Sequence, residues 1–422
     1  MRRFLTFALP VFLMAGCANI SSLFSTPEPT PVSTNTPVAI ATSTSTTTPT
    51  VTPGGPRTLR VWVPPQFDPA AETPAGAILQ ERLDEFIARR PGLQIEIRVK
   101  SESGVSSLLN SLSATRAAAP SVMPDLVALS RIDLEAAASD GLLHPLDGLT
   151  TLLDDPDWYT YARQLAHIQT TAFGLPFAGD TLALVGYNTQ LPTTWDELPE
   201  ETLFIFPAAD PQALFSISLY LSAGGTLSDD QGLPTVDEEI LAEMLSFFVP
   251  PEENQLISPL VITFESDEQV WNALTEQRGN LAVNLASSFL EDQRATLNLA
   301  PLPGLEAGQY TLATGWSWAL AGSNPENQPL AVELAEFLSD SQFLAEWTQA
   351  AGYLPTRPTA LAAWEDVNSK MGLAQTAESA NLIPGEDLLV TLGPLFTEAT
   401  LSVLNGEQLP AEAAQSVIDQ IE

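Results

Sequence analysis

The chain has 422 residues, and its 52 acidic side chains against 16 lysines and arginines give a formal net charge of −36. Such an anionic chain repels phosphate backbones and anionic membrane surfaces, so we expect no nucleic acid among its partners. The two lysines, Lys100 and Lys370, do not follow a glycine, which excludes a phosphate-binding Gly-Lys-Ser/Thr loop. One cysteine, Cys17, and two histidines exclude an intrachain disulfide and disfavour a zinc site, and we expect no metal and no cofactor.

The N-terminus has the pattern of an export signal. Arg2 and Arg3 precede an apolar stretch over residues 4–14, and Ala15-Gly16-Cys17 follows it. A positive start, a short apolar region and small residues before a cleavage point are typical of a secretory signal peptide. The cysteine after the small pair resembles a bacterial lipoprotein signal, which implies a signal peptide over residues 1–16 and lipidation of Cys17. A plain secretory signal with an incidental cysteine is the alternative.

Residues 17–56 form the next predicted segment. Residues 21–56 are rich in Thr, Pro and Ser, and they carry too few apolar side chains to build a core. In an extended polyproline conformation about 30 such residues would reach roughly 90 Å. We therefore predict a tether that holds the folded part away from the membrane.

The folded part begins with alternating strand and helix patterns. Residues 59–63 form a β-rich run, and Leu79, Leu83, Phe86 and Ile87 then recur at helical spacing. Residues 93–99 are apolar at every second position, which completes a strand–helix–strand unit and predicts parallel strands.

Further along, residues 108–119 favour a helix, 125–129 a strand and 331–347 one helix. The predicted fold class is therefore α/β. In open α/β sheets, ligands bind beyond the carboxyl ends of the strands, which favours the loops after Val63 and Leu129.

Short motifs then follow one another in a fixed order. They are Pro-Asp-Leu-Val at 124–127, Asp-Gly-Leu-Leu-His-Pro-Leu-Asp at 140–147, Phe-Gly-Leu-Pro-Phe-Ala-Gly-Asp at 173–180, Leu-Val-Gly-Tyr-Asn at 184–188, Pro-Thr-Thr-Trp-Asp-Glu-Leu at 192–198, Leu-Ser-Asp-Asp-Gln-Gly at 227–232, Gly-Asn-Leu-Ala-Val at 279–283, Pro-Leu-Pro-Gly at 301–304, Gly-Trp at 315–316 and Ala-Ala-Gly-Tyr-Leu-Pro-Thr-Arg at 350–357. Together they resemble bacterial extracellular solute-binding proteins, the family of the maltose- and oligosaccharide-binding receptors. The similarity covers almost everything after residue 57.

This resemblance implies a periplasmic-binding-protein-like fold with two α/β lobes, a ligand cleft and several hinge crossovers. Carried over, residues 57–186 plus 303–345 form the first lobe and residues 187–302 plus 346–422 the second. Closure of the lobes around a solute would then present the closed form to the permease of an ABC importer. We expect a monomer whose partners are a small solute, the permease subunits and, through the lipid anchor alone, the membrane.

Sugars bind to proteins by ring stacking on aromatic side chains and by hydrogen bonds to planar polar groups. By resemblance, Trp316 lies in a family segment that faces the cleft; a core indole is the alternative, and we expect Trp318 to take that core role. Asp180 stands where several family members present a ligand-contacting carboxylate, and a turn carboxylate that caps backbone amides is its alternative. Gln66, Phe67 and Asp68 follow the first strand, where solvated loop residues are equally common.

The remaining candidates also have structural alternatives. Ser130 and Arg131 follow the third strand, where relatives often place an aromatic ring, and a carboxylated ligand is the alternative partner for Arg131. Phe289 stands where relatives often have tryptophan, with core packing as its alternative. Tyr353 belongs to a motif that can simply hold the C-terminal helices.

Two other chemistries, calcium binding and hydrolysis by a serine nucleophile, do not fit the sequence. The segment 229–232 is too short for a calcium loop, so we predict a turn there. The Gly-Trp-Ser-Trp-Ala segment at 315–319 departs from a nucleophile elbow, and both histidines precede Ser317.

We therefore expect no enzyme and no catalytic residues. The predicted function is an extracytoplasmic, membrane-anchored receptor that delivers a solute, in our expectation a neutral carbohydrate, to an ABC importer. A surface sensor or adhesin with the same fold, or a carbohydrate-active hydrolase, are the alternatives.

Overall fold

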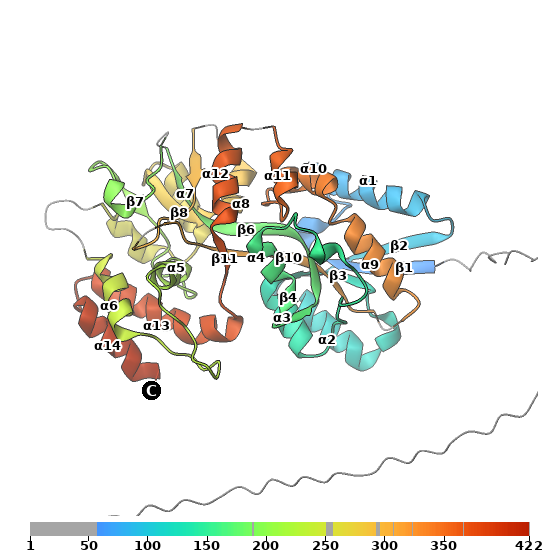
Figure 1. Ribbon diagram of the computed structural model, residues 1–422, viewed down its shortest axis with the longest axis horizontal. Helices are drawn as coiled ribbons and strands as arrows, with labels where there is room; N and C mark the ends of the chain where they lie inside the picture. Colours follow the sequence, from blue (N-terminus) through green and yellow to red (C-terminus); the bar gives the residue numbers. More distant parts are fainter. Residues whose placement is uncertain are drawn as a thin grey trace, which may run out of the picture. The chain divides into compact units, whose positions relative to one another are not determined.

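A computed structural model describes residues 57–187, 190–249, 256–292, 296–306, 308–322, 324–365 and 367–421. The signal, the tether and Cys17 lie outside these residues. The remaining chain forms one compact unit (Figure 1).

The described chain alternates strands and helices. The strands are β1 (Arg57–Val63), β2 (Leu93–Val99), β3 (Leu126–Ser130), β4 (His167–Ile168), β5 (Thr171–Ala172), β6 (Gly174–Gly186), β7 (Phe204–Ile205), β8 (Leu281–Leu285), β9 (Asn298–Ala300), β10 (Thr311–Leu320) and β11 (Ala380–Leu382). The helices are α1 (Pro74–Ala88), α2 (Leu108–Ala118), α3 (Arg131–Ser139), α4 (Thr160–Leu165), α5 (Leu214–Ser222), α6 (Glu238–Ser246), α7 (Asp267–Thr275), α8 (Ala286–Asp292), α9 (Gln328–Phe337), α10 (Ser341–Ala351), α11 (Pro358–Ala362), α12 (Val367–Glu378), α13 (Glu386–Leu404) and α14 (Pro410–Ile421).

The predicted strand–helix–strand unit is confirmed. The side chain of Thr73 accepts a hydrogen bond from Gly76 N at the start of α1, and Pro74 occupies the first helical position, where its missing N–H costs nothing. Leu79, Leu83 and Phe86 form the buried face of this helix. Strands β1 and β2 pair in parallel, as the connecting helix requires.

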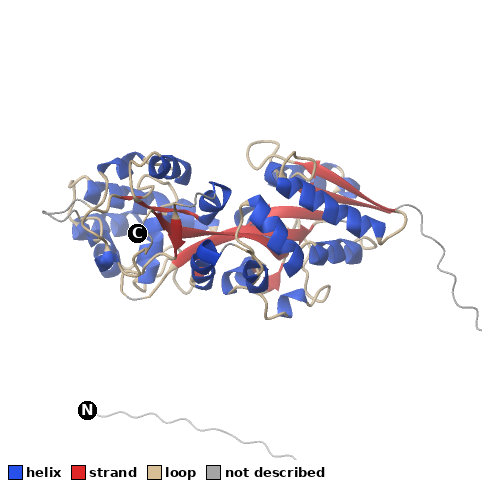
Figure 2. Cartoon of the chain, turned by 90° about the horizontal axis from the view of Figure 1, so that it is seen from above, coloured by secondary structure: helices blue, strands red, loops and turns tan. Residues whose placement is uncertain are grey.

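The described strands form a mixed sheet in the order β2-β1-β3-β10-β6-β8-β7, with β11 beside β10 and β9 beside β6. Strands β1, β2 and β3 are parallel, and β10 runs antiparallel to both β3 and β6. Helices flank the strands (Figure 2).

Strand β6 joins the two halves of this sheet. Residues 174–181 pair with β10, and residues 182–186 pair with β8. One half therefore contains β1, β2 and β3, and the other contains β7, β8 and β9, so that β6 and β10 pass through the centre of the fold (Figure 1). The α/β class is confirmed, and the residue limits of the two lobes remain a proposal.

Two facing glycines, Gly179 on β6 and Gly315 on β10, have no room for a side chain. A Cβ atom on Gly179 would lie 2.1 Å from the hydroxyl oxygen of Tyr161, and one on Gly315 would lie 2.4 Å from the carbonyl oxygen of Ala178. These approaches pack α4 and β10 directly against the backbone of β6.

One predicted element is wrong. Residues 331–347 do not form one helix, because α9 ends at Phe337 and α10 begins at Ser341. Between them Asp340 accepts hydrogen bonds from Gln342 N and Phe343 N. A carboxylate that caps backbone N–H groups favours a helix start over a helix interior.

Helix α13 is long and apolar enough by composition to cross a membrane, and 44% of its apolar window is buried inside the protein. Leu389, Leu392, Phe396 and Val403 form its buried face, and it packs against α5 and α14. We interpret α13 as a core helix of this unit.

Candidate functional site

An aromatic cluster lies where β1, β10 and the segment after α10 meet. Phe67 ends the 3-10 helix η1 (Pro65–Phe67), which directly follows β1, and its ring is buried. The ring of Trp316 meets it edge-on at 5.1 Å between centroids, and the ring of Tyr353 lies 5.6 Å away. Trp316 and Tyr353 are partly exposed. We name Phe67, Trp316 and Tyr353 the aromatic cluster.

Polar groups border this cluster. Gln66 is exposed and hydrogen-bonds to the side chain of Tyr353. Asp68 accepts a hydrogen bond from Ala70 N at 2.9 Å, which places its carboxylate in a turn. Burial raises the pKa of the Tyr353 hydroxyl, and the acids Asp180 and Glu102 raise it further.

Asp180 lies in the middle of β6, where the two halves of the sheet meet. Its side chain is buried, and Oδ1 accepts hydrogen bonds from Thr181 N at 2.9 Å and from Ser287 N at 3.0 Å. Burial raises the pKa of this carboxyl to about 6, against the lowering effect of the hydrogen bonds from Ser287. The carboxylate thus links β6 to the first turn of α8, because it accepts hydrogen bonds from backbone N–H groups of both elements.

Phe289 lies on α8, and its ring is 4% exposed and belongs to the hydrophobic core. Ser130 ends β3, and its hydroxyl accepts a hydrogen bond from Asp133 N as the cap of α3. Their sequence-based assignment as ligand residues stays a prediction, and the structure gives each of them a packing or capping role.

The guanidinium of Arg131 contacts the end of α4 and the start of β4. Its Nη1 donates hydrogen bonds to the carbonyl oxygens of His167 at 2.7 Å and of Gln164 and Leu165 at 3.4 Å each. Its Nε lies 3.9 Å from a carboxylate oxygen of Glu135. Among the nine predicted residues, the structure therefore brings Gln66, Phe67, Trp316 and Tyr353 together and gives Arg131 a different set of neighbours.

Acids that the sequence did not single out surround the same region. The charges of Glu102, in the loop after β2, and of Glu291, in α8, help to raise the pKa of Tyr353. Glu291 also reaches the neighbouring residue, because a Cβ on Gly352 would lie 2.7 Å from its Cγ. Glu102 could have been found from the sequence, because it follows β2 and ligands of α/β proteins bind beyond the carboxyl ends of strands.

A second group missed by sequence reasoning starts α7. Burial raises the pKa of Asp267 to about 7, and the charges of Asp210 and Asp180 contribute. Asn284 is fully buried at the end of β8 and donates from Nδ2 to the Asp267 carbonyl oxygen at 2.8 Å. Within the described residues, Asp267 Oδ1 and Asn284 Oδ1 are buried acceptors without a hydrogen-bond partner.

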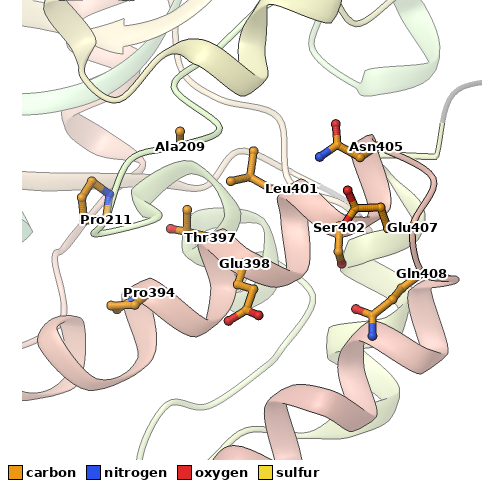
Figure 3. A pocket seen from close by; sticks show the side chains of 10 residues that line it. All are labelled: Ala209, Pro211, Pro394, Thr397, Glu398, Leu401, Ser402, Asn405, Glu407 and Gln408. Carbon is orange, nitrogen blue, oxygen red and sulfur yellow. The ribbon is translucent and has the colours of Figure 1, made fainter.

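Two cavities lie elsewhere in the described part of the chain. One, of about 630 Å³, lies between α13 and the loop before α5 and contains none of the predicted site residues (Figure 3). The other, of about 580 Å³, lies beside α4 and includes Arg131. Within the described ranges, no group of three or more His, Cys, Asp or Glu side chains is placed to hold a metal ion.

The structure also shows the surroundings of Trp318, Asp229 and Ser317. Trp318 is 3% exposed and stacks on Phe177 at 4.5 Å, which confirms its expected core role. Asp229 accepts hydrogen bonds from Gln231 N and Leu233 N, which confirms the predicted turn. Ser317 is fully buried inside β10 and not exposed at a strand-to-helix turn.

Comparison with known proteins identifies the family. The model of the bacterial extracellular solute-binding protein family matches residues 70–342. The chain belongs to this family. No sequence among the curated proteins matches it.

Several solved structures share the fold of this chain. The cyclic α-maltosyl-1,6-maltose-binding protein of Arthrobacter globiformis has 17% identity and a TM-score of 0.71, over 87% of this chain and 98% of that one. The sugar-binding protein MalE of Xanthomonas citri has 18% identity and a TM-score of 0.71, over 86% and 96%. A solute-binding protein of Thermotoga lettingae, bound to α-D-tagatose, has 19% identity and a TM-score of 0.63, over 87% and 100%. These similarities establish a periplasmic-binding-protein-like fold, and the family places this solute-binding protein outside the cytoplasm.

Proposed function

We propose that this solute-binding protein is a lipid-anchored receptor that captures a carbohydrate and delivers it to the permease of an ABC importer. Family membership gives the solute-binding role, and the finer statements on solute, anchor and transport are the proposal. The main observation in favour of a carbohydrate solute is the aromatic cluster, in which Trp316 and Tyr353 lie partly exposed around Phe67.

The chemistry of the cluster suits a sugar. An aromatic face matches the apolar C–H face of a sugar ring, and hydroxyl groups need paired donors and acceptors. Gln66 offers an amide and Tyr353 a hydroxyl beside the rings, and Asp180 places a carboxylate on the neighbouring strand. The solved solute-binding protein with bound tagatose, which shares this fold, supports a sugar as the solute class.

Capture would depend on the position of β6. The strand contributes to both halves of the sheet, and Asp180 accepts hydrogen bonds from groups on β6 and α8. A solute that contacts both halves only in one arrangement would bias the protein toward that arrangement, since a ligand shifts an equilibrium by its differential affinity.

The signal-like N-terminus supports delivery of the solute to a membrane complex. Cleavage before Cys17 and lipidation of its thiol would leave the chain anchored, and the Thr/Pro/Ser-rich segment would give the receptor reach.

A thermal-shift screen of the full-length protein in detergent tests this function. The panel contains neutral mono- and oligosaccharides, polyols, amino acids and peptides. A ligand at 100 times its Kd adds about 2.7 kcal/mol to the free energy of unfolding, which raises the melting temperature by several degrees. We expect one sugar class alone to do so. A shift by amino acids or peptides and by no sugar would refute the carbohydrate, and hydrolysis of a sugar would favour the hydrolase alternative.

A further inference from the structure

The cavity beside α4 differs from the rest of this acidic protein. Its volume is about 580 Å³, which lies within the range of small-molecule sites. Its lining consists of Arg131, Trp158, Thr160, Arg163, Gln164, His167, Gln169 and Leu382. No aspartate or glutamate belongs to this lining, although the chain has 52 acids and only 16 lysines and arginines. We name this cavity the α4 pocket.

Several elements build the α4 pocket. Arg131 begins α3, Arg163 and Gln164 belong to α4, His167 belongs to β4, and Leu382 ends β11. Figure 1 shows α3, α4, β4 and β11 near one another, and α4 packs against both β4 and β11. Segments separated by about half of the chain thus contribute to one pocket.

The basic groups are held in place by backbone oxygens. Arg131 donates from Nη1 to the His167 carbonyl at 2.7 Å, and Arg163 donates from Nη2 to the Asp155 carbonyl at 3.1 Å. His167 contacts the Arg163 carbonyl through Nδ1 at 2.7 Å. Hydrogen bonds to neutral carbonyl groups fix these side chains without cancelling their charge, and the Nη2 of Arg131 and the Nη1 of Arg163 make no hydrogen bond within the described residues.

One nearby acid, Glu135, offsets part of the charge of Arg131, and two others pair with a different arginine. Glu135 lies 3.9 Å from Arg131 Nε, at the outer limit of an ion pair. Asp155 and Asp157 pair instead with the buried Arg357, at 3.3 and 3.5 Å, and the guanidinium of Arg357 stacks on the ring of Trp158.

The turn beside the pocket is strained. Gln169 adopts a φ of 56°, in the left-handed region that a residue with a Cβ seldom occupies. Strain of this kind is often retained where a residue serves a site. The turn joins β4 to β5 and places Gln169 in the lining of the α4 pocket, where its amide adds hydrogen-bonding capacity.

We propose that the α4 pocket binds a small oxyanion, a carboxylate or phosphate group, held by Arg131, Arg163 and His167. Guanidinium groups match both oxyanions through paired N–H donors. The lining of the α4 pocket shares no residue with the aromatic cluster, so the proposal does not depend on the identity of the solute bound there. It also gives Arg131 a carboxylate-binding role of the kind that the sequence left open.

Titration of the full-length protein with inorganic phosphate, citrate and glucuronate, each at an ionic strength matched with sodium chloride, tests the site. Calorimetry should show saturable binding of at least one of them with a Kd of about 1 mM or tighter. Glucuronate and citrate report a carboxylate, and phosphate reports a phosphoryl group. If none of the three binds above the chloride background, the proposal is overturned.

Variants locate the bound anion. Arg163 is exposed, so Arg163→Gln should fold normally and weaken binding about tenfold or more, as the loss of a charged hydrogen bond does. His167→Gln should weaken it several-fold. The control Arg278→Gln removes an exposed arginine that pairs with Glu276, and it should leave the Kd unchanged. Unchanged binding in Arg163→Gln, or loss in Trp316→Ala alone, would place the anion elsewhere and overturn the proposal.

Discussion

The indole of Trp316 meets the ring of Phe67 edge-on, with 5.1 Å between the centroids and 88° between the planes. Two residues further along β10, Trp318 stacks instead on Phe177 and is 3% exposed. Both tryptophans lie on the same strand, but Trp316 retains exposed surface and Trp318 retains almost none. We therefore interpret Trp316 as part of the proposed ligand site and Trp318 as a core residue.

This contrast predicts different effects on stability. Trp318→Ala should lower the free energy of unfolding by about 3–5 kcal/mol, because it leaves a cavity in a packed core. Trp316→Ala should cost clearly less, because part of its ring already contacts solvent. Urea unfolding of the two variants measures the difference, and equal losses would contradict the assignment of Trp316 to the site.

Asp267 should destabilise the protein at neutral pH. Burial raises its pKa to about 7, so the folded state holds a proton that the unfolded state has released above about pH 4. Stability therefore falls as the pH rises from about 4 to 7 and is constant beyond that range.

Asp267→Asn should consequently raise the free energy of unfolding by about 1–3 kcal/mol at pH 8, with a smaller gain at pH 5. The exposed neighbour Glu268, in the same first turn, provides the control, because Glu268→Gln lacks this burial cost and should give no gain. Thermal melts at the two pH values measure both variants. A gain for Asp267→Asn that is as large at pH 5 would show that burial of the charge is not its cause.

Asp180 should make solute binding pH-dependent. Its carboxyl has a pKa of about 6 because of burial, so it becomes protonated as the pH falls through that value. A protonated carboxyl loses the strong acceptor that a sugar hydroxyl needs, and we expect the affinity for the best sugar to fall about tenfold between pH 7.5 and pH 5.

Asp180→Asn retains an acceptor oxygen for Thr181 N and Ser287 N and removes the titration. Its affinity should be low at both pH values. Titrations at pH 7.5 and pH 5 distinguish the cases, and a pH-dependent affinity in the variant would assign the effect to another group.

The fold was largely predictable from local patterns. Leu79, Leu83 and Phe86 define one face of α1, and alternation defines β2, because burial on one face imposes these periods. The break between α9 and α10 was missed because the apolar pattern continues across Asp340, whereas the local hydrogen bonds of its carboxylate determine the helix start.

The site was less accessible, because its contacts join residues that are far apart in the sequence. Phe67 contacts Tyr353, and Asp180 accepts a hydrogen bond from Ser287 N, 107 residues away. Position after a strand predicted that Gln66 and Phe67 would lie near a site. It did not predict that Arg131, also after a strand, would turn toward α4, since tertiary contacts determine that side-chain direction.

Cys17 should anchor the protein. Cells expressing Cys17→Ser should release the receptor into the soluble extracytoplasmic fraction, because the lipid chains on that thiol are the proposed attachment. Labelling with an alkyne fatty acid should mark the wild-type chain and not the variant. A labelled variant, or one that stays in the membrane fraction, would contradict the lipoprotein proposal.

The most direct test of the account is a fluorescence titration of the full-length protein and of Trp316→Ala with the sugar that raises the melting temperature most. The account predicts a saturable change in tryptophan emission for the wild type and an affinity reduced at least tenfold in the variant, since the stacking surface is lost. Equal affinity in both proteins would show that the solute binds away from the aromatic cluster and would contradict the proposed site.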